Sequence, residues 1–285
     1  MRRPLTPARL LAGTALLSLV ALLGPAAGAT ATAKAAPRPA PAQTPVAPRA
    51  LVLYDTTGPW GPLGGTYVTE LVKLTGHLGA WVAHPVTGYV PGEVNRYAGV
   101  VYLGSTYDEP IPPAFLDDVL STRVPVLWAG DNIWQLAART AGFAHRYGYT
   151  WKRLDFAPVA HVVYRGTALT RDPANPAGIM DELVTDPAKA TVLGAAVRPD
   201  GSTFPWAVRS GNLTYVGEVP LSYRSPTDRS LAFADLIFDV LAPDRAARHA
   251  ALLSQHDVGQ DADPARLRAV VSELYRVPPP AQPRR

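Results

Sequence analysis

The sequence predicts an α/β protein with an open, doubly wound, mostly parallel sheet, helices on both faces and an antiparallel edge. From Ala50 onward, short β-branched and apolar runs alternate with helix-length segments whose apolar residues recur every three or four positions. This alternation is typical of parallel β-α-β units. The second half is richer in strand-like runs, and Gly211-Asn212 marks a hairpin turn between two of them. That turn predicts the antiparallel edge.

The individual elements follow from the same patterns. The first strand covers 50–54, and after a polar loop a helix is expected over 65–78, with Leu71, Leu74 and Leu78 on one face. Seven further strands and three further helices complete the predicted domain. The strands cover 81–86, 100–103, 124–128, 161–164, 191–197, 204–208 and 213–216 when the hairpin partner is counted, and the helices cover 113–121, 133–141 and 227–241.

The first 31 residues have the pattern of a signal peptide. Arg2, Arg3 and Arg9 provide a basic start, and the apolar stretch over 10–24 is shorter than the ~20 residues of a membrane span. We therefore expect a secreted or cell-envelope protein without a stable membrane span after cleavage. An uncleaved N-terminal anchor is the alternative, and the basic start leaves the general and twin-arginine export routes open.

Residues 32–49 form an Ala- and Pro-rich spacer that we expect to be extended and disordered. Eight of the 27 basic residues lie in residues 1–49 and 277–285, which leaves 19 basic against 23 acidic residues in 51–276. Residues 51–276 therefore have a small negative net charge and lack the excess of basic residues that nucleic-acid binding needs, so we expect no nucleic-acid partner. The chain has no cysteine, which excludes disulfides and thiolate chemistry.

Polar residues cluster directly after the predicted strands, where doubly wound sheets bind ligands. They are the candidate ligand-binding residues: Asp55, Thr56, Ser105, Asp108, Glu109, Asp131, Asn132 and Glu218. Thr57, Thr106, Tyr107, Tyr223 and Arg224 lie beside them. Residues of these types also cap helices and close turns, so a structural role is the competing interpretation.

Motifs for covalent catalysis and for metal binding are weak. Gly104-Ser105-Thr106 lacks the second glycine of a nucleophile elbow, and Pro59 and Pro62 remove amide donors that a phosphate loop needs. No two of the six histidines have zinc-site spacing. Five tryptophans provide either stacking surfaces for sugar rings or core packing. They are Trp60, Trp128, Trp134, Trp151 and Trp206.

The C-terminal segment reads as one β-α unit followed by a Pro- and Arg-rich tail over 277–285. An apolar run over 250–253 leads to His256 and Asp257, and Asp263 caps a helix that has Pro264 at its first position. One such unit cannot bury its own apolar stripe. It either adds a layer to the preceding domain or begins a second one.

Several stretches together resemble a family of uncharacterised exported bacterial proteins, the YdaL-like group, which is related to polysaccharide deacetylases. The resemblance covers about residues 50–275 and is carried by four stretches. They are 50–61 (ALVLYDTTGPWG), 102–110 (YLGSTYDEP), 132–136 (NIWQL) and 263–269 (DPARLRA).

The resemblance implies an amidotransferase-like α/β domain over 50–249, similar to class I glutamine amidotransferases, and the first β-α unit of a deacetylase-like (β/α) barrel over 250–276. Gly130-Asp131-Asn132 stands where the amidotransferase cysteine would be, so that half lacks its nucleophile. In the barrel half, Asp257 matches the first-motif aspartate, and His256 precedes it. These two are weak candidate metal ligands, because a metal such as zinc is implied only for a complete barrel, and we expect no cofactor in this chain.

Three functions remain open at this stage. The first is a non-catalytic domain that binds cell-wall or extracellular polysaccharide or a protein partner. The second is a metal-dependent carbohydrate deacetylase or hydrolase, with a cleft around Asp55, Asp108, Glu109 and Asp131. The third is a truncated gene product without activity of its own.

Overall fold

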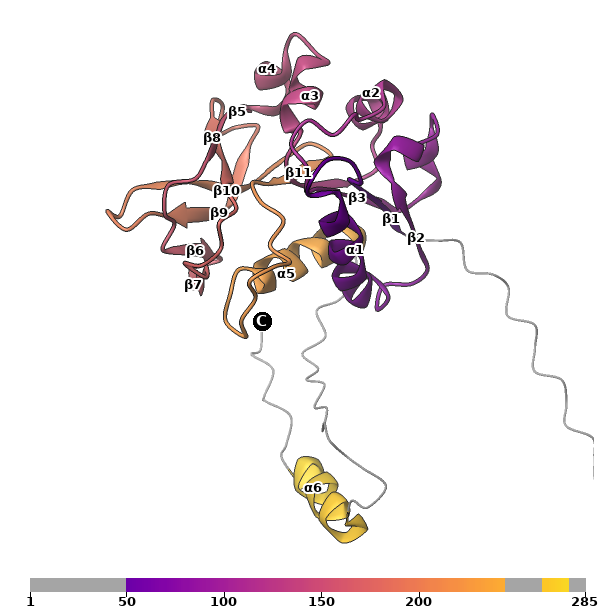
Figure 1. The fold of residues 1–285 in the computed structure, drawn as a ribbon, viewed down its shortest axis with the longest axis vertical. Coiled ribbons are helices and arrows are strands. Elements are labelled where there is room, and N and C mark those ends of the chain that lie inside the picture. The colour runs from indigo at the N-terminus through magenta and orange to yellow at the C-terminus, as the bar shows by residue number, and fades with distance from the viewer. Residues whose placement is uncertain (1–49, 244–262, 277–285) are drawn as a thin grey trace, which may run out of the picture. The chain divides into compact units, whose positions relative to one another are not determined.

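The computed structural model describes residues 50–243 and 263–276. Its main element is a nine-stranded sheet with strand order β2-β1-β3-β4-β11-β10-β9-β6-β7 (Figure 1). The first five strands in this order pair in parallel, and the remaining pairs are antiparallel. The predicted mixed α/β sheet with antiparallel strands at one edge is therefore confirmed, and its antiparallel part is four strands wide.

The parallel strands are β1 (Ala50–Tyr54), β2 (Trp81–Pro85), β3 (Gly99–Gly104), β4 (Val126–Gly130) and β11 (Leu213–Val216). Strands β1, β3, β4 and β11 lie inside the sheet and are almost completely buried, which explains their mostly apolar sequences, whereas β2 is an edge strand without a buried residue. Every residue of β3, β4 and β11 is buried. The antiparallel strands are β6 (His161–Tyr164), β7 (Thr167–Thr170), β9 (Thr191–Val197) and β10 (Thr203–Ser210).

Helices cover both faces of the sheet, as predicted. One face carries α1 (Gly61–Thr75) and α5 (Ser230–Leu241). The other carries α2 (Pro113–Ser121), α3 (Ile133–Ala138), α4 (Phe143–Tyr147) and the short 3-10 turns η1 (Val86–Gly88) and η2 (Glu93–Arg96). Figure 1 shows these two groups on opposite sides of the sheet.

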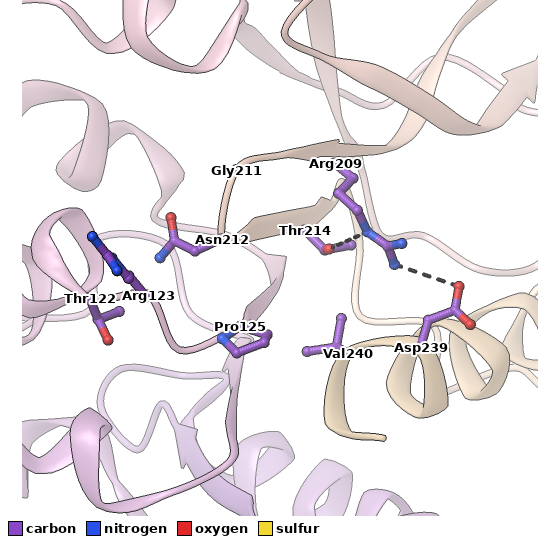
Figure 2. Close-up of a pocket in the computed structure, with 9 residues that line it drawn as sticks. All are labelled: Thr122, Arg123, Pro125, Arg209, Gly211, Asn212, Thr214, Asp239 and Val240. Atoms are coloured by element: carbon purple, nitrogen blue, oxygen red, sulfur yellow. Dashed lines mark hydrogen bonds and ion pairs between the residues drawn. The ribbon is translucent and has the colours of Figure 1, made fainter. Parts of the chain in front are cut away.

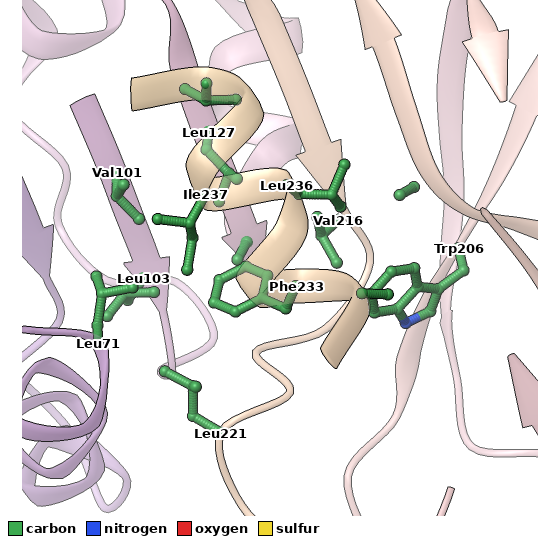
Figure 3. Packing of buried hydrophobic residues seen from close by; sticks show 14 of the residues in the cluster. Leu71, Val101, Leu103, Leu127, Trp206, Val216, Leu221, Phe233, Leu236 and Ile237 are labelled. Atoms are coloured by element: carbon green, nitrogen blue, oxygen red, sulfur yellow. The ribbon is translucent and has the colours of Figure 1, made fainter. Parts of the chain in front are cut away.

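The larger core lies under α5. Phe233, Leu236 and Ile237 are fully buried against Val101 and Leu127 of the sheet (Figure 3). Burying one such side chain contributes roughly 1.5–3 kcal/mol, so this helix is a main source of stability.

The helices predicted over 65–78, 133–141 and 227–241 have different bounds in the structure, where they cover 61–75, 133–138 and 230–241. The first begins at Gly61 rather than at 65, because two glycines let the helix approach the preceding loop. A Cβ on Gly64 would lie 2.0 Å from the carbonyl oxygen of Asp55. The helix predicted over 133–141 ends at Ala138, as α3, and a further short helix that was not predicted, α4, begins at Phe143 after Gly142.

A second, two-stranded sheet was not predicted. It consists of β5 (Tyr149–Asp155) and β8 (Ile179–Val184), which pair antiparallel. In β8 two acidic residues, Asp181 and Glu182, occupy buried positions. Acidic residues are rare in buried strands, so the sequence pattern did not predict β8.

The predicted hairpin is confirmed. Gly211 has φ +56°, and Ser210 pairs with Leu213 across the turn.

The C-terminal helix is also confirmed. It is α6 (Pro264–Arg276), and the Asp263 Oδ1 accepts the N–H of Ala265 at 2.8 Å. The strand predicted before it, the signal peptide, the spacer and the tail lie outside the described residues. Within the ranges that are described, no helix is long and apolar enough to cross a membrane.

Candidate functional site

The loops after four adjacent parallel strands lie side by side at the carboxyl edge of the sheet. β1, β3, β4 and β11 are neighbours in that order, and their ends lead into the segments 55–60, 105–112, 131–132 and 217–229. Because parallel strands end at the same edge, the polar residues predicted from the sequence come together there.

Asp55 is the centre of this cluster and is fully buried. Its Oδ1 accepts the hydroxyl of Tyr102 at 2.6 Å, and its Oδ2 accepts the backbone N–H of Thr106 at 2.8 Å. The Asn132 amide donates to the same Oδ2 at 3.3 Å. The carboxyl group thus joins residues from three strand ends and has no surface left for a ligand.

The environment of Asp55 changes its ionisation. Its pKa is raised to about 7, mainly by burial; the hydrogen bonds from Tyr102 and Thr106 oppose this rise, and the charges of Glu109 and Asp131 add to it. This carboxyl group therefore titrates near neutral pH.

Glu109 ties the loop after β3 to the loop after β1. Its Oε1 accepts the N–H of Thr56 at 3.1 Å, and its Oε2 accepts the N–H of Thr57 at 3.1 Å. The Thr57 hydroxyl donates to Oε2 at 2.5 Å. Since Glu109 is fully buried, its role is to fix the loop that leads into α1.

Asn132 ties the loop after β4 to the same cluster. It has a left-handed backbone, φ +74°, and its side-chain amide donates to the Thr106 carbonyl and to the Tyr102 hydroxyl, both at 2.9 Å. Gln135 continues this link, because its amide donates to the Glu109 carbonyl oxygen at 2.8 Å. Three loops are therefore held together by buried hydrogen bonds.

An outer layer of side chains lies over this buried cluster. The ring of Tyr107 packs on that of Trp134 with centroids 4.4 Å apart and an interplanar angle of 31°. The Trp134 indole N–H donates to Asp108 Oδ1 at 3.0 Å, and Trp151 lies 6.1 Å from Trp134. Tyr107 is 55% exposed, so this aromatic surface is open to solvent.

Asp131 lies beside the outer layer and keeps its carboxyl group free of hydrogen bonds from any described residue. Its backbone is fixed, because its N–H donates to the Gly104 carbonyl at 3.0 Å and its carbonyl accepts the Trp128 indole at 2.8 Å. Burial raises the pKa of Asp131 to about 6, and the charge of Asp108 adds to the rise. The two acids are therefore close enough to interact.

Ser105 is present at the same edge. Its hydroxyl is buried and has no hydrogen-bond partner in the described part of the chain.

Glu218, at the end of β11, is part of a separate buried network. Its Oε1 accepts the Trp206 indole at 2.9 Å and Arg229 Nε at 3.2 Å. Its Oε2 accepts Arg171 Nε at 3.3 Å. Arg229 in turn donates to the carbonyls of Ser222 at 3.2 Å and Tyr223 at 3.3 Å. Glu218 thus positions the 217–229 loop through Arg229.

The remaining predicted residues were the weak metal ligands. Asp257 and His256 lie outside the described residues. Across 50–243 and 263–276, no three His, Asp or Glu side chains gather in a way that could hold a metal ion.

A pocket of 440 Å³ lies at the opposite, amino-terminal ends of β4 and β11 (Figure 2). Arg123, Arg209 and Asp239 supply its charged groups. Arg209 is already engaged, with Nε donating to Thr214 at 3.1 Å and an ion pair to Asp239 at 3.6 Å. This pocket shares no residue with the predicted site.

Sequence reasoning missed the partners that organise the site. Tyr102 lies within the apolar strand β3, and nothing in the pattern marks its hydroxyl as the donor to Asp55. Arg171 lies 47 positions from Glu218 in the sequence. Arg229 is 11 positions away and follows a polar loop, so no local pattern links either arginine to Glu218. Of the predicted tryptophans, Trp128 and Trp206 are fully buried, whereas Trp60 is 57% exposed.

The fold and the site define a mixed α/β domain with a rigid, polar and aromatic surface at the carboxyl edge of its parallel strands. No protein-family model matches the chain, and no curated protein matches it. Several solved structures are similar at low identity. A protein described as ThuA-like from Bacteroides uniformis is 16% identical, with a TM-score of 0.42, and the match covers 69% of this chain and 94% of that one.

Two other solved structures match at a similar level. The exo-β-1,4-mannosidase of Opitutaceae bacterium strain TAV5 is 12% identical with a TM-score of 0.41, over 68% of this chain and 33% of that one. A ThuA-like protein from Parabacteroides merdae is 14% identical with a TM-score of 0.32, over 61% and 84%. At these values the matches assign no function.

Proposed function

We propose that the α/β domain is a non-catalytic glycan-binding module of an exported protein, and that the glycan binds at the carboxyl edge of the parallel strands. The observation that carries this proposal is the exposed Tyr107–Trp134 pair with Asp108 and Asp131 beside it. Aromatic rings bind the apolar faces of sugars, and carboxylates accept hydrogen bonds from hydroxyl groups.

The hydrogen-bonding of the inner layer supports a binding role over a catalytic one. Asp55 and Glu109 are fully buried, and the oxygens of both accept hydrogen bonds from neighbouring loops. A group that acts on a substrate must reach it, so these two acids serve as supports for the surface above them.

Export, a cell-envelope location and a cell-wall or extracellular polysaccharide as ligand are parts of the same proposal. So are the amidotransferase-like classification and the relation to polysaccharide deacetylases. They rest on the signal-peptide pattern and on the family resemblance of the sequence.

The test is a titration of the purified protein with soluble cell-wall glycans by isothermal titration calorimetry. Tyr107→Ala is expected to lower affinity about tenfold, which corresponds to ~1.4 kcal/mol. Trp81→Ala is the matched control, because Trp81 is also an exposed aromatic residue but begins the edge strand β2 and so lies at the amino edge of the parallel strands, opposite the candidate site. Absence of binding to wild type at millimolar concentration would falsify the proposal.

One observation favours a hydrolase as the second candidate. Asp131 has a pKa of about 6, lies beside Asp108 and keeps its carboxyl group free, as a general acid in glycoside hydrolysis requires. Incubating the protein with the glycans that it binds and analysing the products distinguishes the two functions. Product formation that Asp131→Asn abolishes would replace the binding proposal.

A further inference from the structure

The pocket at the amino-terminal ends of β4 and β11 is a second candidate site, on the edge of the sheet opposite the glycan surface (Figure 2). Three segments form it: the turn that leads into β4, the hairpin turn between β10 and β11, and the last turn of α5. Its volume of 440 Å³ falls within the range of roughly 300–1,000 Å³ that is typical of sites for small organic molecules. The pocket can therefore hold a ligand larger than an inorganic ion.

Arg123 brings an unpaired positive charge to this pocket. The residue is exposed, and its guanidinium group forms no hydrogen bond or ion pair with any residue that the structure describes, so the side chain is free to turn toward a ligand. Its backbone is held by the residue before it, because Thr122 Oγ1 accepts the N–H of Val124 at 3.0 Å and donates to Asn95 Oδ1 at 2.7 Å. Arg123 thus offers a full set of N–H donors to an oxyanion.

Arg209 lies on the other side of the pocket and has part of its guanidinium group unused (Figure 2). Its Nε donates to Thr214 Oγ1 at 3.1 Å, which fixes the direction of the side chain. Its Nη2 lies 3.6 Å from Asp239 Oδ2, which is too far for a hydrogen bond. Its Nη1 has no hydrogen-bond partner within the described ranges, and the side chain is 36% exposed. Arg209 is therefore a second donor for a bound anion.

The charged groups around the pocket leave one excess positive charge. Asp239 is shared by two arginines, because its Oδ2 lies 3.0 Å from Arg165 Nη2 and 3.6 Å from Arg209 Nη2. Arg165 also pairs with Asp235 through Nη1, at 3.1 Å. Two acids and two arginines balance in this network, and Arg123 stands outside it. A ligand with a single negative charge would therefore neutralise the pocket.

The remaining walls suit the uncharged part of an organic molecule. Pro125 and Val240 contribute apolar groups. The Asn212 amide donates to the Val119 carbonyl at 3.0 Å, which fixes its side chain, and its Oδ1 receives no donor from the described part of the chain. That oxygen can accept a hydrogen bond from a hydroxyl group. A carboxylate on a hydroxylated ring has both features that the pocket matches.

We propose that this pocket binds a small hydroxylated carboxylic acid of the class of the sugar acids. Arg123 and Arg209 hold the carboxylate, and a hydroxyl group of the ligand donates to Asn212. The pocket shares no residue with the glycan surface at the carboxyl edge, so this inference stands independently of the proposed function.

Isothermal titration calorimetry of the purified protein with glucuronate tests the proposal, and glucose is the uncharged molecule with the same ring. Glucuronate is expected to bind about tenfold or more tightly than glucose, and Arg123→Ala should weaken glucuronate binding about tenfold. Asp239→Asn should tighten it, because this change removes the acid that competes for Arg209. Arg153→Ala is the matched control, because Arg153 is an exposed arginine that does not line the pocket. Thermal melting checks that each variant is folded.

Several results would overturn this assignment. They are glucuronate binding that is equal in Arg123→Ala and wild type, glucose binding as tight as that of glucuronate, and no glucuronate binding at millimolar concentration. Acetate or inorganic phosphate that binds as tightly as glucuronate would overturn the hydroxylated class of ligand. Tyr107→Ala should leave glucuronate binding unchanged. If it abolishes that binding, the acid binds at the carboxyl edge and the pocket is not its site.

Discussion

The Glu109 Oε2 accepts both the backbone N–H of Thr57, at 3.1 Å, and its hydroxyl, at 2.5 Å. The two residues come from loops after different strands and are separated by 52 positions in the chain. This contact fixes the position of the loop that carries Trp60 relative to the loop that carries Tyr107. The candidate surface therefore depends on a buried carboxyl group that no ligand touches.

Glu109→Gln is expected to destabilise the protein by about 1–3 kcal/mol, because the amide would turn one N–H₂ group toward a backbone N–H of Thr56 or Thr57. Urea denaturation measures the change. Asp117→Asn is the control, since it removes an exposed ion pair with Arg139 that is worth at most ~1 kcal/mol. Equal midpoints for both variants would show that the Glu109 contacts do not hold the loops.

Glu218→Gln is expected to cost about 3 kcal/mol or more, because it removes the main countercharge of two buried arginines, Arg171 and Arg229. The loss should appear in chemical denaturation and be accompanied by increased hydrogen exchange in the 217–229 loop. Glu70→Gln is the matched variant, because its pairs with Lys73 and Arg224 are more exposed. A Glu218→Gln protein as stable as Glu70→Gln would contradict the positioning role of Glu218.

The features that were predicted from the sequence are those that local pattern determines. Unbroken apolar runs such as 50–54 and 213–216 mark strands buried on both faces, and the strand-end rule placed Asp55, Glu109, Asp131 and Asn132 at one edge. Whether each residue would face a ligand or a neighbouring loop was left open. That distinction depends on contacts between segments about 25 to 80 positions apart, such as Asn132 with Asp55, and a single sequence does not display them.

The two strands of the smaller sheet, β5 and β8, were not predicted because their sequences resemble those of loops. β5 contains Lys152 and Arg153 at exposed positions around a bulge, and β8 contains buried acids. Tertiary packing overrides the local preference of both segments, because each strand is completed by the other. The assignment of His256 and Asp257 stays a prediction, since both lie outside the described residues.

The free energy of unfolding is expected to fall as pH rises from about 4 to about 7. The folded-state pKa values of Asp55, about 7, and Asp131, about 6, lie above the usual value of 3.8. Between the unfolded and folded pKa the native state binds more protons, so raising the pH destabilises it. Asp155 and Asp200 have lowered pKa values, and their contribution is lost only below that window.

Urea denaturation at pH 4.5, 5.5, 6.5 and 7.5 measures this dependence. Asp131→Asn should flatten the slope between pH 4.5 and 6, because it removes one of the carboxyl groups whose pKa is raised in the folded state. Stability that rises steadily across the window in wild type would contradict the assignment of raised pKa values to these acids.

Glu182 gives the sharpest prediction about stability, because both of its carboxyl oxygens are buried and none of the described residues forms a hydrogen bond with them. Burial raises the pKa of Glu182 well above its usual value, and the charge of Asp181 adds to the rise. The native state therefore keeps the proton that the unfolded chain loses above about pH 4.3. Every unit of pH beyond that point lowers the free energy of unfolding of the wild-type protein.

Glu182→Gln has nearly the same shape and cannot ionise. The amount by which its free energy of unfolding exceeds that of wild type should therefore be small at pH 5 and should increase toward pH 8. Asp181→Asn is the matched variant, and it should destabilise instead, because Asp181 is paired with Lys152 at 3.1 Å. Parallel stability curves for Glu182→Gln and wild type between pH 5 and 8 would show that Glu182 is hydrated or ionised in the native protein.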